Sequence, residues 1–160
     1  SADFIADYLQ TFFTGDRTGE SGAANSNAPI PVQSKNAVKY IANELLENAM
    51  KFNNDNSPYQ TCINFNLHSD RLVFKVTNSI TEERATSFKR FINKVLSDDA
   101  NDLYVEQMKA NALADDSVHH SGLGFLSMIC DYSAKLGWKF QYYNNDNKQL
   151  TVTTMVTLEL

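Results

Sequence analysis

The chain has 160 residues and a mass of 18.0 kDa, which is enough for one domain with its own hydrophobic core. Hydrophobic residues make up 42% and charged residues 21% of the sequence, as in globular proteins, so wholesale disorder is not expected. The formal net charge of −5 argues against a general binder of nucleic acids or anionic membranes. No apolar run is long enough to span a membrane and no signal-type segment opens the sequence, so we expect a cytoplasmic protein.

The sequence begins with a helix and a loop that we separate from the main domain. Residues 3–13 carry apolar side chains at helical spacing, and residues 14–33 are rich in Gly, Ser, Asn and Pro. We therefore expect an N-terminal helix and a mobile loop at residues 1–33, followed by one domain at residues 34–160. Phe12 and Phe13 make this first helix a candidate element of a homodimer.

The main domain begins with a second predicted helix. Ser34 or Asn36 is a typical N-cap residue, and an Asn-rich turn after Phe52 ends the helix. The apolar positions of this helix follow a single stripe: Val38, Ile41, Leu45, Ala49 and Phe52. The stripe predicts that one side of the helix packs against the core.

Two hairpins are predicted from alternating apolar and polar residues. Residues 61–68 and 71–77 alternate around a two-residue Ser69-Asp70 turn, which predicts a β-hairpin. Residues 138–143 and 150–158 predict a second hairpin that closes the domain.

Three further helices are predicted between the two hairpins. Residues 82–96 have an apolar face that extends to Leu96, residues from about 100 to 114 form the next helix, and residues 123–136 form the last. Gly137 is expected to end that last helix. The order of elements predicts an α+β fold, with an antiparallel sheet covered on one face by helices.

The first of two motifs that carry chemistry lies in the helix that ends near Phe52. Glu44, Asn48 and Lys51 occupy positions i, i+4 and i+7, so they project from one side of that helix, beside its apolar stripe. An amide oxygen is a hard ligand for Mg²⁺, a carboxylate can deprotonate a nucleophile, and an ammonium group neutralises phosphate charge. The pattern therefore suits Mg²⁺–phosphate chemistry. The alternative is an ordinary solvated helix edge, where Glu and Lys at this spacing are common.

The second motif is a glycine pair at the start of a predicted helix. The sequence has six glycines, but none between Gly22 and Gly122, so the late group needs a local explanation. Gly122, Leu123 and Gly124 stand where a helix begins, and there backbone N–H groups and the positive end of the helix dipole can meet a phosphate. The alternative is a plain junction between a loop and a helix.

The cysteines and histidines form no metal-binding pattern in the sequence. Cys62 and Cys130 are isolated, so we expect two buried free thiols rather than a disulfide or a zinc site. His119 and His120 precede the glycine pair and are candidates for a phosphate contact, with a purely surface position as the alternative.

Together the two motifs resemble those of a known superfamily. Asn-Glu-Leu-x-x-Asn-Ala-x-Lys-Phe at residues 43–52 resembles the N-box of the GHKL (histidine-kinase-like) ATPases, and Gly-Leu-Gly-Phe at residues 122–125 resembles their second glycine box. The resemblance covers roughly residues 34–159. It implies a two-layer α/β sandwich of the Bergerat type, with a mixed, mainly antiparallel sheet and an ATP lid at about residues 79–121.

The resemblance also implies a role for each motif residue. Asn48 would hold Mg²⁺ through its amide oxygen, Lys51 would contact phosphate, and Glu44 would activate an acceptor hydroxyl as the catalytic residue. Three residues of the glycine motif would present backbone N–H groups to the phosphates of ATP: Gly122, Leu123 and Gly124.

One part of the superfamily pattern is replaced in this chain. The superfamily has Asp-x-Gly-x-Gly after the second strand, its Asp accepting the adenine amino group. Here residues 77–81 read Thr-Asn-Ser-Ile-Thr, so Asn78 stands in the position of the aspartate and both glycines are missing. An amide oxygen can still accept from the adenine amino group, so Asn78 is the expected base contact.

Among small stand-alone members, the sequence resembles the SiaB-type and anti-sigma-factor-type serine/threonine kinases of bacterial partner-switching systems. This resemblance implies ATP and Mg²⁺ as cofactors and a small regulatory protein, phosphorylated on Ser or Thr, as partner. Two alternatives stay open: a catalytically weak, nucleotide-gated module that sequesters a partner, and a degenerate fold that binds no nucleotide. The missing glycines favour the module, whereas Glu44 argues against it.

Overall fold

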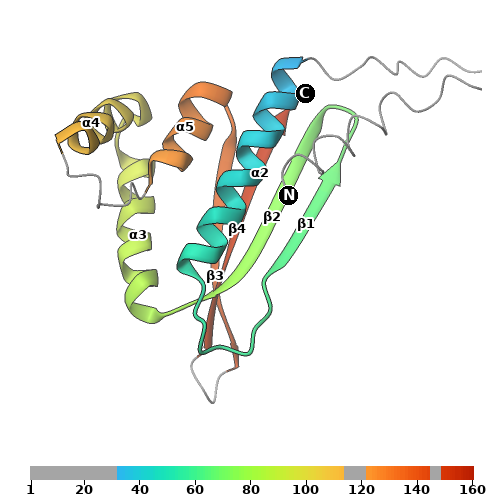
Figure 1. Ribbon diagram of the computed structural model, residues 1–160, viewed down its shortest axis with the longest axis vertical. Coiled ribbons are helices and arrows are strands. Elements are labelled where there is room, and N and C mark those ends of the chain that lie inside the picture. The colour runs from blue at the N-terminus through green and yellow to red at the C-terminus, as the bar shows by residue number, and fades with distance from the viewer. Residues whose placement is uncertain (1–31, 114–121, 145–148) are drawn as a thin grey trace, which may run out of the picture.

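The structure, a computed structural model, describes residues 32–113, 122–144 and 149–160. The predicted N-terminal helix and loop, His119 and His120 lie outside these residues. Figure 1 shows the described elements in chain order: α2 (Val32–Phe52), β1 (Cys62–Leu67), β2 (Arg71–Ile80), α3 (Glu82–Ser97), α4 (Ala100–Leu113), α5 (Leu123–Tyr132), β3 (Lys135–Asn144) and β4 (Gln149–Glu159). None of the described helices is long and apolar enough to cross a membrane.

The four strands form one sheet in the order β1-β2-β4-β3, and every pairing among the described strands is antiparallel. The expectation of a mixed sheet is therefore corrected to an antiparallel one for this part of the chain. Both predicted hairpins are confirmed, and across the Ser69-Asp70 turn the His68 N–H donates to the Arg71 carbonyl at 2.8 Å. β2 continues beyond its predicted end to Ile80, because β4 pairs with it along its whole length.

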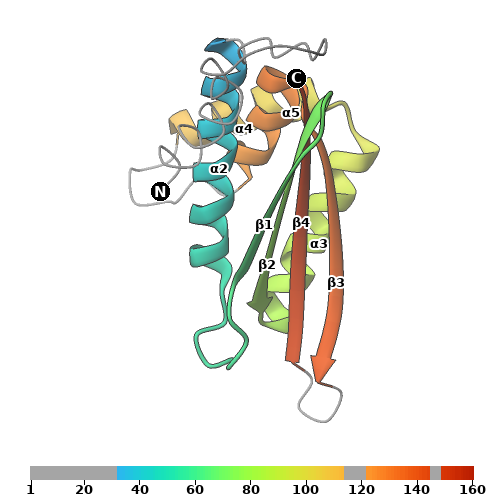
Figure 2. The same cartoon turned by 90° about the vertical axis from the view of Figure 1, so that its right-hand side faces the viewer.

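The core lies between the sheet and the helices. Even-numbered side chains of β2 and β4, such as Phe74 and Val156, are buried against the predicted apolar stripe of α2. The odd-numbered side chains point to the other face, where the Thr77 and Thr153 hydroxyls hydrogen-bond to each other at 2.8 Å. Figure 2 shows α2 on one side of the strands. The described helices thus pack on one face of the sheet, as predicted.

The boundary between α5 and β3 differs from the sequence prediction. The helix was expected to reach Leu136, but α5 ends at Tyr132, and Leu136 and Gly137 belong to β3. Ser133 adopts a left-handed backbone conformation (φ 55°), and the Ala134 N–H closes the helix end on the Met128 carbonyl at 3.0 Å. Leu136 then packs against the core from the sheet side, where it pairs with Val156 of β4.

Two predictions about burial are wrong. Leu96, placed on the apolar face of α3, has 74% of its surface exposed near the end of that helix. Cys62 is exposed on β1, whereas Cys130 is partly buried on α5, so only one of the two thiols is shielded. Both thiols are free, as expected.

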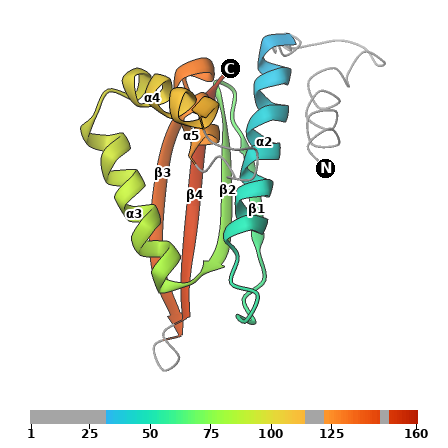
Figure 3. The same ribbon diagram turned by 60° about the vertical axis from the view of Figure 1, so that its left-hand side comes forward.

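An aromatic cluster joins the helix layer to the sheet, with Phe88 of α3 at its centre. The Phe88 ring centroid lies 5.8 Å from that of Phe125 on α5 and 6.0 Å from those of Trp138 and Phe140 on β3. Phe88 also stacks on Phe52 at the end of α2, with centroids 6.2 Å apart. Figure 3 shows α3 and α2 on either side of the view, with α5 between them at one end. Aromatic packing therefore holds these three helices and the sheet together.

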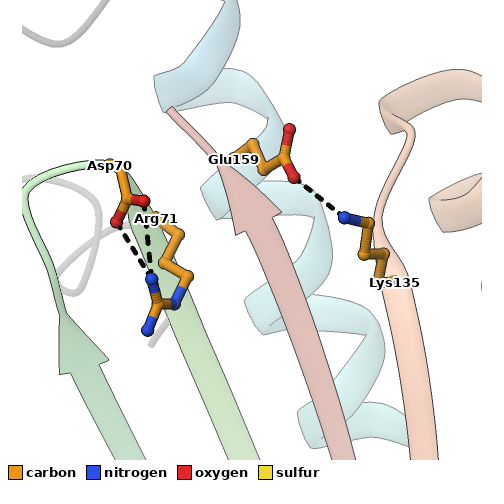
Figure 4. A network of polar contacts seen from close by, with 4 residues as sticks. All are labelled: Asp70, Arg71, Lys135 and Glu159. Carbon is orange, nitrogen blue, oxygen red and sulfur yellow. Dashed lines mark hydrogen bonds and ion pairs between the residues drawn. The ribbon is translucent and has the colours of Figure 1, made fainter.

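Two exposed ion pairs lie at one end of the sheet. Figure 4 shows Asp70 beside Arg71, with Nη1 and Oδ1 3.2 Å apart, and Lys135 beside Glu159, with Nζ and Oε1 2.9 Å apart. All four side chains are exposed, so each pair contributes about 0–1 kcal/mol to stability. The fold thus depends on its aromatic and aliphatic core rather than on these charges.

Candidate functional site

The two sequence motifs meet where α2 packs beside α5. A side-chain Cβ at Gly124, in the first turn of α5, would collide with the Glu44 carboxylate of α2. Glu44 is half-buried at this point, and burial raises the pKa of its carboxyl, with the Glu47 carboxylate adding to the rise. Glycine at position 124 therefore lets a carboxylate lie directly against the start of a helix.

The requirement for glycine at position 122 comes from its own backbone and from Phe91. Its backbone is left-handed (φ +94°), and a Cβ there would lie 2.6 Å from Cε2 of Phe91 on α3. The Leu126 N–H makes the first helical bond of α5, to the Gly122 carbonyl at 3.2 Å. The N–H groups of Leu123 and Gly124 precede that bond, so they belong to the open, positive end of the helix.

Asn48 and Asn78 lie beside the same small cavity. Both line a cavity of about 20 Å³ whose other walls include Phe88 and Phe125. Asn78 is only 5% exposed, and its side-chain N–H donates to the Ser79 carbonyl at 2.9 Å. Such a cavity has room for about one water molecule. The described structure therefore has no room for a base beside Asn78.

Lys51 lies in the last turn of α2 and is exposed. Its Nζ lies 5.3 Å from the centroid of the Phe52 ring. The structure thus leaves its side chain at the edge of the predicted site.

Glu44 and Asn48 are oxygen donors of the kind that Mg²⁺ binds. Asn48 follows Glu44 by one helical turn of α2, so an amide oxygen and a carboxylate lie on the same side of that helix. Mg²⁺ commonly takes one or two protein oxygens and completes its shell with phosphate and water. Within the described ranges there is no group of three His, Cys, Asp or Glu side chains that could hold a metal without such help.

A much larger cavity, of about 530 Å³, lies beside the predicted site. Its inner wall is aromatic and comes from α2, α3 and α5: Phe52, Phe88, Phe91 and Phe125. The outer wall is polar and is built by the turn after α2 and the first turns of α3: Asn53, Asn54, Asp55, Asn56, Thr81, Glu83, Arg84 and Ser87. Gly122 lines the cavity too, so the cavity borders the start of α5.

Sequence reasoning missed this polar wall. Ser79, 1% exposed, donates from its hydroxyl to the Asn53 side chain at 2.8 Å, and its carbonyl accepts from the Asn54 N–H at 3.2 Å. Arg84 donates from Nη1 to the Asn53 carbonyl at 3.1 Å, which ties α3 to the same turn. The Asn-rich turn after Phe52 was predicted as the end of a helix, but its part in lining a cavity was not.

The segment that lacks the expected glycines has a clear structural role. It continues β2 to Ile80 and leads directly into α3, whose first turn is capped by Thr81, with the Arg84 N–H donating to its hydroxyl at 3.2 Å. Residues 82–113 of the expected lid are helices α3 and α4. Residues 114–121 of that expected lid lie outside the described ranges.

The fold defined by these elements is an α+β domain with a four-stranded antiparallel sheet and helices packed on one of its faces. The crystal structure of the SiaB–SiaC complex from Pseudomonas aeruginosa contains a chain of similar fold. The TM-score is 0.60 at 14% sequence identity, over 99% of this chain and 83% of that chain. No protein-family model matches the sequence, and no curated protein matches it.

Proposed function

We propose that the protein binds Mg²⁺-ATP at the α2–α5 junction and transfers phosphate to a Ser or Thr of a small regulatory protein, in bacterial partner switching. The observation that carries this proposal is the contact between Glu44 and Gly124, because it brings a carboxylate to the open end of a helix. A carboxylate at this point lies beside the place where the terminal phosphate of a nucleotide would bind.

The chemistry that these residues would perform is mainly positioning and charge neutralisation. The N–H groups of Leu123 and Gly124 would bind phosphate oxygens, and Lys51 would swing in from the edge to neutralise their charge. A bound Mg²⁺, held through Asn48, would supply further charge neutralisation. Glu44 would accept the proton of the partner hydroxyl, and its raised pKa makes the carboxylate a stronger base than an exposed one.

A protein partner is part of the same proposal. The neighbour of similar fold comes from the structure of a complex of two different proteins. We infer that this chain likewise acts on or sequesters a small protein in the cytoplasm, either alone or as a homodimer. A nucleotide-gated binding module is the second candidate, because residues 77–81 lack the two glycines of the superfamily pattern.

Two substitutions on α2 test the proposal. Glu44→Gln should lower single-turnover phosphate transfer to a partner encoded beside the gene by about a hundredfold or more, since a general base is lost. The same variant should keep its affinity for Mg²⁺-ATP in calorimetric titration. Asn48→Ala should instead lower the affinity for Mg²⁺-ATP by about tenfold, because one oxygen ligand of the metal is removed. The affinity for ATP without Mg²⁺ should change little.

Glu47→Gln is the matched control. Glu47 lies on the same helix and is exposed, where it accepts a hydrogen bond from the Asn43 amide at 3.0 Å. The transfer rate of Glu47→Gln should stay near that of the wild type, because burial, the larger cause of the raised Glu44 pKa, is unchanged. Equal transfer rates for the wild type and Glu44→Gln would show that Glu44 is not the general base. ATP binding with no transfer in the wild type would support the binding module instead.

A further inference from the structure

The 530 Å³ cavity is large enough for a small-molecule ligand, whereas the space beside Asn78 is not. Opening the smaller cavity would require the rings of Phe88 and Phe125, whose centroids are 5.8 Å apart, to separate. Phe88 is held in place by four other aromatic rings, so that separation disrupts the core. The larger cavity needs no such change.

The polar wall of the larger cavity is fixed by hydrogen bonds. Buried Ser79 pins Asn53 and Asn54 to the end of β2, and Asn54 closes its own turn by accepting from the Ser57 N–H at 2.9 Å. Arg84 joins α3 to this turn by donating to the Asn53 carbonyl. A site held in this way binds a ligand without a large ordering cost.

The chemistry of the walls favours a flat ring with exocyclic amino groups. Four phenylalanines offer an apolar surface for a ring, and the two carboxylates on the rim, Asp55 and Glu83, accept hydrogen bonds but donate none. Asparagine side chains on the same rim both donate and accept, which suits ring nitrogens. Gly122 also lines the cavity, so the cavity reaches the helix start where phosphate would lie.

We propose that this cavity binds the adenine base of the nucleotide, with the Asp55 and Glu83 carboxylates accepting from its exocyclic amino group. The inference rests on the proposed function, since the nucleotide's phosphates lie at the α2–α5 junction. It differs from the sequence expectation, in which Asn78 contacts the base.

A pair of tryptophan substitutions on α3 tests the location of the base. Ser87 lines the cavity, so a tryptophan at this position should fill it. Ser87→Trp should lower the affinity for adenosine and for ATP by about tenfold or more, measured by calorimetry. Asn93→Trp places the same side chain at an exposed position of α3 that does not line the cavity, and it should bind both ligands as the wild type does. Thermal unfolding followed by circular dichroism verifies that both variants fold.

The identity of the base is tested with two nucleosides. Inosine has a carbonyl where adenosine has its amino group, so the wild type should bind adenosine about tenfold or more tightly than inosine. Asp55→Asn and Glu83→Gln, combined in one variant, should remove most of that preference. An unchanged preference in the combined variant would contradict the role of these carboxylates.

The outcomes separate the two proposals. If Ser87→Trp binds adenosine normally and Asn78→Asp alters the affinity, the base binds at Asn78 and the inference is wrong, while the proposed function stands. If adenosine binding depends on Ser87 but no phosphate is transferred, the inference stands and the kinase proposal fails. A wild type that binds neither adenosine nor ATP would overturn both.

Discussion

Two neighbouring regions of the helix layer differ in how they relate to the sequence. The α2–α5 junction carries both sequence motifs, and there the Glu44 carboxylate touches the Gly124 backbone position. The 530 Å³ cavity is bordered by the ends of those motifs, Phe52, Gly122 and Phe125, but its polar wall, from the turn after α2 and from α3, belongs to neither motif. The motif glycines therefore mark places where chain segments come close together. The space for a ligand forms instead where neighbouring side chains leave a gap.

Gly122 lies on the boundary of the two regions, and its substitution should have the largest effect on stability. Gly122→Ala forces a left-handed backbone on a residue with a Cβ and pushes that Cβ against Phe91. We expect a loss of about 2–4 kcal/mol in the free energy of unfolding, measured by urea denaturation.

Gly124→Ala, in the same turn, is the matched comparison for Gly122→Ala. The Glu44 carboxylate that it would meet is the end of a flexible side chain, and alanine favours the helix, so stability should change by less than about 1 kcal/mol. Equal losses for the two variants would show that the close approach of Glu44 is as rigid as that of Phe91.

Ser79→Ala tests the stability of the turn that lines the cavity. The variant loses the 2.8 Å bond to Asn53 and leaves buried polar groups with fewer partners, so we expect a loss of about 1–2 kcal/mol. Thr77→Val removes a hydrogen bond two residues earlier on the same strand, where Thr77 is only partly buried and water can replace the bond. A cost for Ser79→Ala no greater than that for Thr77→Val would mean that Ser79 does not fix the turn.

The smallest effect on stability is expected from the titration of the Glu44 carboxyl. Because burial and Glu47 raise the pKa of this carboxyl, the folded state binds its proton more tightly than the unfolded state does. Its contribution is fully present below the ordinary carboxyl pKa and is lost as the pH rises through the raised pKa. Glu44→Gln lacks this loss, so its stability relative to the wild type should rise between about pH 4 and about pH 7.

Urea denaturation at several pH values measures this difference between the variant and the wild type. Glu47→Gln is again the control, because it removes the charge next to Glu44 and should make the wild-type trend weaker without abolishing it. A constant difference between Glu44→Gln and the wild type over this pH range would mean that Glu44 titrates as an ordinary exposed carboxyl.

Local patterns account for the parts of the fold that were predicted correctly. The stripe of α2 and the alternation in β1 and β2 repeat over many residues, so each periodicity identifies its element. The end of α5 was missed because a single left-handed residue, Ser133, turns an apolar run from helix to strand. The alternation of apolar residues around Leu136 fits either period over so short a stretch.

The sequence by itself determined which polar residues share one side of α2 and which glycines open α5. It did so because helical spacing and helix starts are local properties of the chain. Only the tertiary structure decided that Glu44 lies on Gly124, that Asn48 and Asn78 enclose space for about one water, and that the larger cavity lies elsewhere. The position of that cavity depends on the distances between α2, α3 and α5, which long-range packing sets, and no local spacing encodes those distances.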